Sequence, residues 1–179
     1  MFFEKAGSGG RTSKRHRKDF TRYANLGEMV SDAYWLKMEK WFNGKPVKFK
    51  PLHELTVDLD APIRKGIDAV YENELFTPPP PPPKYIINEV KYHRGAISPT
   101  PSGWKNKLSR TVTKSRGRQM SEKWIEYNLD AIIKNENLAY DILNNHEIFL
   151  TGISHNGKKV EIFQLSKDLK KIKKQPYER

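Results

Sequence analysis

An acid and a base two residues apart interrupt an otherwise apolar run near the middle of the chain. Residues 84–93 read Lys-Tyr-Ile-Ile-Asn-Glu-Val-Lys-Tyr-His, and their β-branched and aromatic side chains predict a buried strand. Side chains alternate along a strand, so Glu89 and Lys91 leave the same face. Burying a charge is costly unless the charge is paired or bound to a metal, so these two residues favour a metal site. The alternative is an edge strand whose charged face meets solvent.

A second acid lies upstream in a segment of similar character, because residues 66–71 read Gly-Ile-Asp-Ala-Val-Tyr and predict another strand. This segment and the later Asn-Glu-Val-Lys-Tyr resemble the motif strands of the PD-(D/E)xK nuclease superfamily. The resemblance implies that Asp68 and Glu89 bind Mg²⁺ or Mn²⁺, with the backbone carbonyl of Val90 as a further ligand. It also implies that Lys91 orients or helps to deprotonate the attacking water and offsets charge at phosphorus.

A more specific motif occupies residues 117–124, Gly-Arg-Gln-Met-Ser-Glu-Lys-Trp. It is similar to the Gly-x-Gln-Met-Ser-x-x-Trp signature of restriction-endonuclease-fold toxin domains, found in bacterial polymorphic and contact-dependent toxins. The resemblance covers residues 26–129 and implies that Gln119 points into the site and that Glu28 assists it as a base or supports a metal ligand. On residue physics alone, Gln119 is equally a surface residue, and Glu28 is equally a helical acid favoured by the helix dipole.

These side chains require a sheet and helices to hold them. Apolar residues recur at helical spacing in three segments, residues 25–43, 119–137 and 138–145. Beyond the two motif strands, alternating or β-rich patterns predict strands at residues 53–59, 148–154 and 160–165. The last two form a hairpin through Asn-Gly at residues 156–157. The resemblance implies a restriction-endonuclease-like α/β fold, with a mixed central sheet flanked by helices and a C-terminal β-hairpin.

Six consecutive prolines, residues 78–83, separate the two motif strands, where the family usually has a short turn. Such a run predicts a polyproline II rod of about 19 Å. We favour a stiff hairpin connection over a docking motif for a proline-reading domain.

Positive charge is concentrated after the candidate site. The formal net charge is +12, and residues 91–118 contain eight bases and no acid. Glycines and prolines in this segment predict a loop above the site, where a phosphate backbone must lie during cleavage; a generic solvated surface is the alternative. Trp104 either stacks on a base or, as we favour, anchors the loop to the core. The candidate nucleic-acid contacts are Arg94, Lys105, Lys107, Arg110, Lys114, Arg116 and Arg118.

The length of 179 residues predicts one domain with loosely structured ends. We expect a basic arm or linker at residues 1–22, a nuclease-like domain at residues 23–166 and a basic tail, as a short helix or a frayed end, at residues 167–179. No apolar run has transmembrane length, no signal-peptide pattern occurs, and the chain has no cysteine. The five histidines lack zinc-ligand spacing.

These observations lead to the hypothesis of a metal-dependent phosphodiesterase. The resemblance implies a DNase toxin domain that a producing bacterium secretes or delivers, and that acts in the cytoplasm of the target cell. It also implies a cognate acidic immunity protein, attracted by the basic cleft. Three alternatives stay open: a tRNA-cleaving RNase of the same fold, a non-catalytic nucleic-acid-binding module, and an adaptor that uses the proline run.

Overall fold

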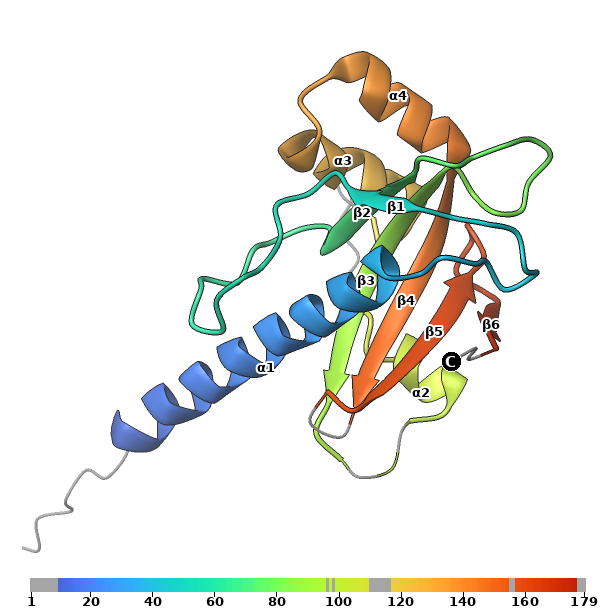
Figure 1. Cartoon of the computed structure of the whole chain (residues 1–179). Helices are drawn as coiled ribbons and strands as arrows, with labels where there is room; N and C mark the ends of the chain where they lie inside the picture. The colour runs from blue at the N-terminus through green and yellow to red at the C-terminus, as the bar shows by residue number, and fades with distance from the viewer. Residues whose placement is uncertain (1–9, 96, 98, 110–116, 155–156, 177–179) are drawn as a thin grey trace, which may run out of the picture.

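A six-stranded mixed sheet forms the centre of the fold (Figure 1). The computed structural model describes residues 10–95, 97, 99–109, 117–154 and 157–176. The strands follow one another across the sheet in chain order: β1 (Phe49–Pro51), β2 (Ala69–Asn73), β3 (Tyr85–His93), β4 (His146–Ser154), β5 (Lys159–Leu165) and β6 (Ile172–Lys174). The strands β3 and β4 pair in parallel, and every other neighbouring pair is antiparallel. The expected α/β class with a mixed sheet is confirmed.

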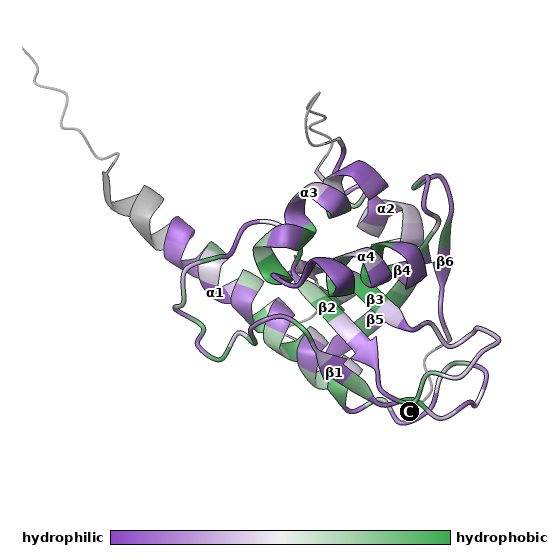
Figure 2. Ribbon diagram, turned by 90° about the horizontal axis from the view of Figure 1, so that it is seen from above, coloured by the Kyte–Doolittle hydropathy of each residue, from purple (hydrophilic) through white to green (hydrophobic). Residues whose placement is uncertain are grey.

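Helices cover both faces of this sheet, which makes three layers (Figures 1 and 2). The helices are α1 (Gly10–Leu36), α2 (Pro101–Lys105), α3 (Glu122–Ile132) and α4 (Glu136–Asn145). On the α1 side, Trp35 packs in one buried cluster with Ile86 of β3. On the opposite side, Ile87 of β3 packs in a second cluster with Ile125 of α3 and Ile142 of α4. Adjacent residues of β3 therefore face different layers, as strand alternation requires.

Unequal strand lengths leave part of β3 without a partner on one side. The last register pair between β2 and β3 is Ala69 with Asn88. Beyond that pair β3 continues to His93, and its other edge stays paired with β4 as far as Ser154. Within the described residues, the edge of β3 at residues 89–93 is therefore not covered by β2, and this open edge is where the candidate acids lie.

The prediction of a strand at residues 53–59 is wrong. These residues form no strand, and β1 lies earlier, at Phe49–Pro51. The apolar members of the alternating pattern have no surface to cover, since Leu55 is 38% and Val57 is 82% exposed. His53 instead turns inward, with its Nε2 atom 3.1 Å from Asp32 Oδ1 on α1.

Several element boundaries also differ from expectation. The first helix begins at Gly10 and ends at Leu36, so it includes more than half of the segment assigned to a flexible arm. The helix expected at residues 119–137 is replaced by α3 and the start of α4, because Asn135 caps α4 by accepting a hydrogen bond from the Leu138 N–H at 3.0 Å. Part of the expected basic tail is strand β6, paired with β5.

The expected hairpins are present. The strands β4 and β5 pair in antiparallel register, with Ile153 opposite Val160; Asn156 of the predicted turn lies outside the described residues. The prolines at residues 78–83 connect β2 to β3, as expected, although they form bends and not one straight rod. In the part of the chain that the structure describes, no helix has the length and apolar character needed to cross a bilayer.

Candidate active site

A cleft of about 590 Å³ lies between α1 and the open edge of β3. All three candidate acids, Glu28, Asp68 and Glu89, line this cleft, together with Lys91. They come from α1, from the residue before β2 and from β3, so three segments that are distant in sequence contribute to one cavity. The sequence-predicted acids and the base are therefore brought together.

Glu89 is the most deeply buried of these acids, at 1% exposure. Its Oε1 atom accepts hydrogen bonds from Lys91 Nζ and, at 2.6 Å, from Gln119 Nε2. Its Oε2 atom is buried and accepts no hydrogen bond from the described residues while Asp68 is ionised; a protonated Asp68 carboxyl is the neighbouring group that can hydrogen-bond to Glu89. A buried carboxylate oxygen without a donor is costly, so this atom has the character of a ligand for a cation.

Asp68 lies directly beside Glu89. The antiparallel register that pairs Ala69 with Asn88 places Asp68 opposite Glu89 when it is extended by one residue. The Val90 N–H donates a hydrogen bond of 2.7 Å to Asp68 Oδ2, which fixes the carboxyl group at the edge of β3. Burial raises the pKa of Asp68 well above its ordinary value, and the neighbouring charge of Glu89 raises it further. The half-buried carboxylate of Asp68 and the buried one of Glu89 need either a proton or a cation between them.

Lys91 supplies the positive charge of the site. Burial lowers the pKa of its ammonium group, but the negative charges of Glu89 and Asp68 outweigh burial and raise that pKa above its ordinary value. Lys91 is therefore protonated at neutral pH in this arrangement. It stabilises negative charge and does not accept a proton while both carboxylates are ionised.

Gln119 reaches the site because the backbone before α3 is unusually turned. Gly117 has φ +70°, and Met120 has φ +67° with a fully buried side chain. Ser121 then caps α3, accepting a hydrogen bond of 3.4 Å from the Trp124 N–H. Between these fixed points Gln119 donates to Glu89, and its Oε1 accepts a hydrogen bond of 2.6 Å from the Ser109 N–H. The placement implied by the resemblance is thus present in the geometry.

Glu28 forms one wall of the cleft. Its Oε2 atom accepts a hydrogen bond of 2.6 Å from Thr56 Oγ1 and lies 3.3 Å from Arg64 Nη2. The charge of Glu28 contributes to raising the pKa of Asp68, although less than burial and Glu89 do. Glu28 is therefore an oriented, paired acid of the wall and not a third member of the Asp68–Glu89 contact.

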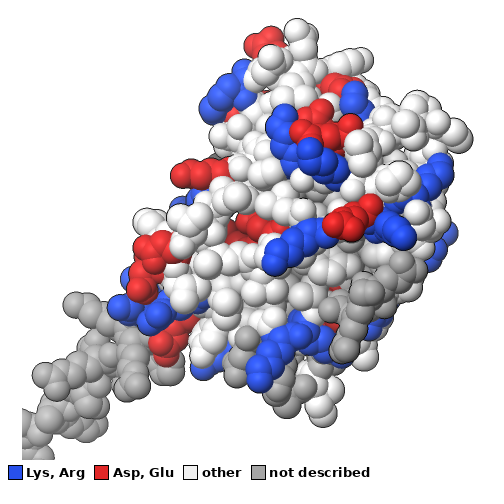
Figure 3. Space-filling view, viewed as in Figure 1, with Lys and Arg blue, Asp and Glu red and all other residues white. Residues whose placement is uncertain are grey.

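The candidate nucleic-acid contacts are distributed unevenly. Arg94 and Lys107 line the cleft, whereas Lys105 donates a hydrogen bond of 2.8 Å to the Lys170 carbonyl and, like Arg118, is not a lining residue. The remaining three lie outside the described residues: Arg110, Lys114 and Arg116. The face drawn in Figure 3 carries both charge signs side by side. The positive charge at the cleft, among described residues, therefore comes mainly from a few side chains.

Trp104 anchors its segment to the core, which confirms the favoured of the two predictions for this residue. It is fully buried, and its Nε1 donates a hydrogen bond of 3.0 Å to Glu161 Oε2. The ring also lies directly against Gly152 of β4, where a Cβ atom would be 2.6 Å from Trp104 Cε2. Trp104 is thus not available to stack on a base.

Sequence reasoning missed the aromatic residues of the cleft. Phe20 and Tyr23 belong to α1, and Tyr92 to β3, and all three line the cavity. The available signal was the recurrence of Phe20, Ala24 and Glu28 every four residues, which marks one helix face. Because Phe20 falls in the segment assigned to a flexible arm, this face was not recognised.

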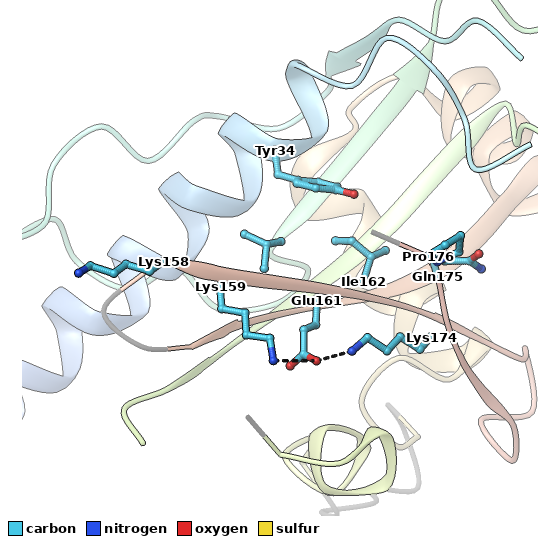
Figure 4. A pocket seen from close by; sticks show the side chains of 9 residues that line it. Tyr34, Lys158, Lys159, Glu161, Ile162, Lys174, Gln175 and Pro176 are labelled. Atoms are coloured by element: carbon cyan, nitrogen blue, oxygen red, sulfur yellow. Dashed lines mark hydrogen bonds and ion pairs between the residues drawn. The ribbon is translucent and has the colours of Figure 1, made fainter. Parts of the chain in front are cut away.

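A second cavity, of about 320 Å³, lies against β5 (Figure 4). Its acid is Glu161, which points away from Tyr34 toward Lys159 and Lys174 in Figure 4. The Glu161 carboxylate is already bound by Trp104 Nε1 and, at 2.6 Å, by Lys174 Nζ. This cavity therefore lacks the paired carboxylates that the cleft contains.

The cleft residues fit a divalent cation of the Mg²⁺ type. No three His, Cys, Asp or Glu side chains among the described residues form a complete metal-binding group. Mg²⁺ nevertheless binds through as few as one or two carboxylates, together with water and substrate phosphate oxygens. Asp68 and the unpartnered Oε2 of Glu89 supply two such oxygens at the cleft.

No protein-family model, curated protein or solved structure matches the chain.

Proposed function

We propose that the protein is a metal-dependent nuclease that hydrolyses phosphodiester bonds at the cleft. The observation that carries the proposal is the Asp68–Glu89 pair, with one buried Glu89 oxygen that has no donor and the other held by Lys91 and Gln119. Asp68 and Glu89 would hold Mg²⁺ or Mn²⁺, which supplies Lewis-acid charge to the phosphoryl group.

Each remaining residue has a role that its contacts support. Lys91, protonated beside Glu89, orients the attacking water and offsets the charge that develops at phosphorus. Gln119 fixes the Glu89 carboxylate and positions water or phosphate. Glu28, held by Thr56, orients groups at the cleft wall. Arg94 and Lys107 supply positive charge for the substrate backbone.

The biological role that we propose follows from the PD-(D/E)xK-like and toxin-like motifs. In this proposal the fold is restriction-endonuclease-like, and the chain is a DNase toxin domain delivered into the cytoplasm of a neighbouring bacterium. An acidic immunity protein would protect the producing cell by covering the cleft. A tRNA-cleaving activity of the same site is the alternative enzyme.

The test is cleavage of plasmid DNA and total RNA by the purified protein, with Mg²⁺ or with EDTA. We expect cleavage with Mg²⁺ and none with EDTA. Glu89→Gln, which keeps the side-chain size but removes the charge, should lower the cleavage rate about 100-fold or more. Glu72→Gln is the matched control, because Glu72 of β2 pairs with Lys50 at 3.5 Å and does not line the cleft. A mobility shift without cleavage would instead identify a non-catalytic nucleic-acid-binding module.

A further inference from the structure

The N-terminal half of α1 gives the cleft an aromatic wall. Phe20, Tyr23 and Tyr92 line the same cavity as Asp68 and Glu89. Phe20 is 68% exposed although it is a large apolar side chain. A single exposed apolar side chain is common at protein surfaces, but this ring lies in one cavity with two further aromatic rings and can contact a ligand bound there. The aromatic wall therefore favours a ligand with a flat, apolar face.

The rings beside Phe20 are held by their neighbours. Tyr23 stacks on Tyr92, with ring centroids 5.2 Å apart and an interplanar angle of 23°. The Arg94 guanidinium lies 4.3 Å from the Tyr23 ring centroid and donates a hydrogen bond of 3.2 Å to the Tyr23 hydroxyl. This Tyr92–Tyr23–Arg94 group is a support that places a cation beside the aromatic wall. Phe20, one turn before Tyr23 on α1, lies next to this support.

The spacing along α1 relates the ring to the acids. Phe20 and Glu28 are eight residues apart on one helix face, or about 12 Å along the axis. Phe20 therefore lies along the cleft from Glu28 of the wall, in the same cavity as Asp68 and Glu89. A phosphodiester at Asp68 and Glu89 would place a neighbouring nucleotide near the ring, with Arg94 and Lys107 available to its phosphates.

We propose that the cleft binds single-stranded nucleic acid, with an unpaired base next to the scissile phosphate stacked on Phe20. This inference names the substrate class of the proposed nuclease and depends on that function for its cleavage arm. In an intact duplex the base faces are stacked on one another, so a protein ring cannot reach them. Aromatic stacking on single strands tolerates any base, since every base has a π-face. DNA and RNA strands share this chemistry, and the test compares them.

Binding is measured first by fluorescence anisotropy, in the Glu89→Gln background, so that strand cleavage is slowed. The probes are a short fluorescein-labelled strand, as DNA and as RNA, and the same strand annealed to its complement. We expect the single strand to bind at least about tenfold more tightly than the duplex, and Phe20→Ala to weaken single-strand binding about tenfold. Phe20→Trp should restore it. Tyr140→Ala is the matched control, since Tyr140 of α4 is 72% exposed and does not line the cleft.

An abasic nucleotide, moved along the strand, identifies the stacked base. When the abasic nucleotide is at the stacked position, the missing base and Phe20→Ala should each weaken binding. The abasic strand should then bind the Phe20→Ala variant no more weakly than either change alone predicts. Equal losses in Phe20→Ala and Tyr140→Ala, or equal binding of duplex and single strand, would overturn the inference. If binding depends on Phe20 but the unmodified protein cuts no strand with Mg²⁺, the base site stands and the nuclease proposal fails. If duplex is cut as fast as single strand regardless of Phe20, the nuclease stands and the base site fails.

Discussion

The carboxyl groups of Asp68 and Glu89 lie together in the cleft that we propose as the active site. Each is held in place by a donor, Val90 N–H for Asp68 and Gln119 for Glu89, and the charge of Glu89 raises the pKa of Asp68. Burial raises the pKa of both groups, so in the absence of a cation their ionised forms disfavour the folded state. A pair of adjacent carboxylates therefore lowers the stability of the fold but is able to bind a cation.

The first prediction concerns stability without metal. Asp68→Asn should raise the free energy of unfolding by about 1 kcal/mol in EDTA, because the amide keeps an acceptor for the Val90 N–H and removes one buried charge. Thermal unfolding measures the change. Mg²⁺ should then raise the melting temperature of the unmodified protein but not that of Asp68→Asn. A less stable Asp68→Asn variant, with unchanged Mg²⁺ stabilisation, would contradict a shared cation site.

The second prediction concerns pH. The folded-state pKa of Asp68 lies above its unfolded value of about 3.9, so the folded form binds the proton more tightly. Stability from this group is therefore fully present below the unfolded pKa and is lost as pH rises toward the folded pKa. The stability advantage of Asp68→Asn in EDTA should accordingly be largest at neutral pH and shrink as pH falls to about 4. Denaturant unfolding across this range checks it, and an advantage that grows on acidification would refute it.

The elements around the site are positioned by close contacts between small and large residues. Gly27 of α1 lies against β3, where a Cβ atom would be 3.3 Å from Val90 Cγ1. Gly152 of β4 lies against the ring of Trp104, which holds α2 on the opposite face. These approaches set how α1 and α2 meet the sheet, and hence the walls of the cleft.

The third prediction tests the contact between α2 and β4. Gly152→Ala would place its Cβ 2.6 Å from the Trp104 ring, which cannot move without disturbing its hydrogen bond to Glu161. We expect a loss of about 1–3 kcal/mol in unfolding free energy and a change in near-UV circular dichroism. The same substitution in a Trp104→Leu background should cost less, because the clash is removed. Equal costs in both backgrounds would mean that the ring is not the obstacle.

For the molecule as a whole, a net charge of +12 favours association with nucleic acid, but only part of that charge faces the cleft. Each phosphate contact adds to the salt dependence of binding through counterion release. The three layers hold the cleft at the edge of the sheet, where β2 ends and β3 continues. The position of the cleft is thus set by strand length.

The fourth prediction separates basic residues at the cleft from those elsewhere. Lys107→Ala should reduce the slope of log K against log salt for a single strand by about 0.7, because one phosphate contact is lost. Lys105→Ala should leave that slope unchanged, because the Lys105 ammonium is bound to the Lys170 carbonyl. Binding titrations at several salt concentrations measure both slopes. Identical effects of the two substitutions would show that binding is not localised at the cleft.

The sequence by itself determined the local features. The strand at residues 84–93, the shared face of Glu89 and Lys91, and the β4–β5 hairpin follow from side-chain alternation and turn chemistry, which involve near neighbours only. The motif at residues 117–124 does not by itself predict the positive φ angles of Gly117 and Met120, which flank Gln119 and turn the backbone before α3.

Only the tertiary structure decided which distant residues meet. The register of β2 against β3 sets Asp68 opposite Glu89, and Gln119 bonds to Glu89 across 30 residues of chain. Phe20 joins the cleft because α1 starts at Gly10 and packs on β3, although the local composition favoured a flexible arm. Long-range packing outweighs weak local preferences, so the local composition around Phe20 did not indicate that this side chain lies in the cleft.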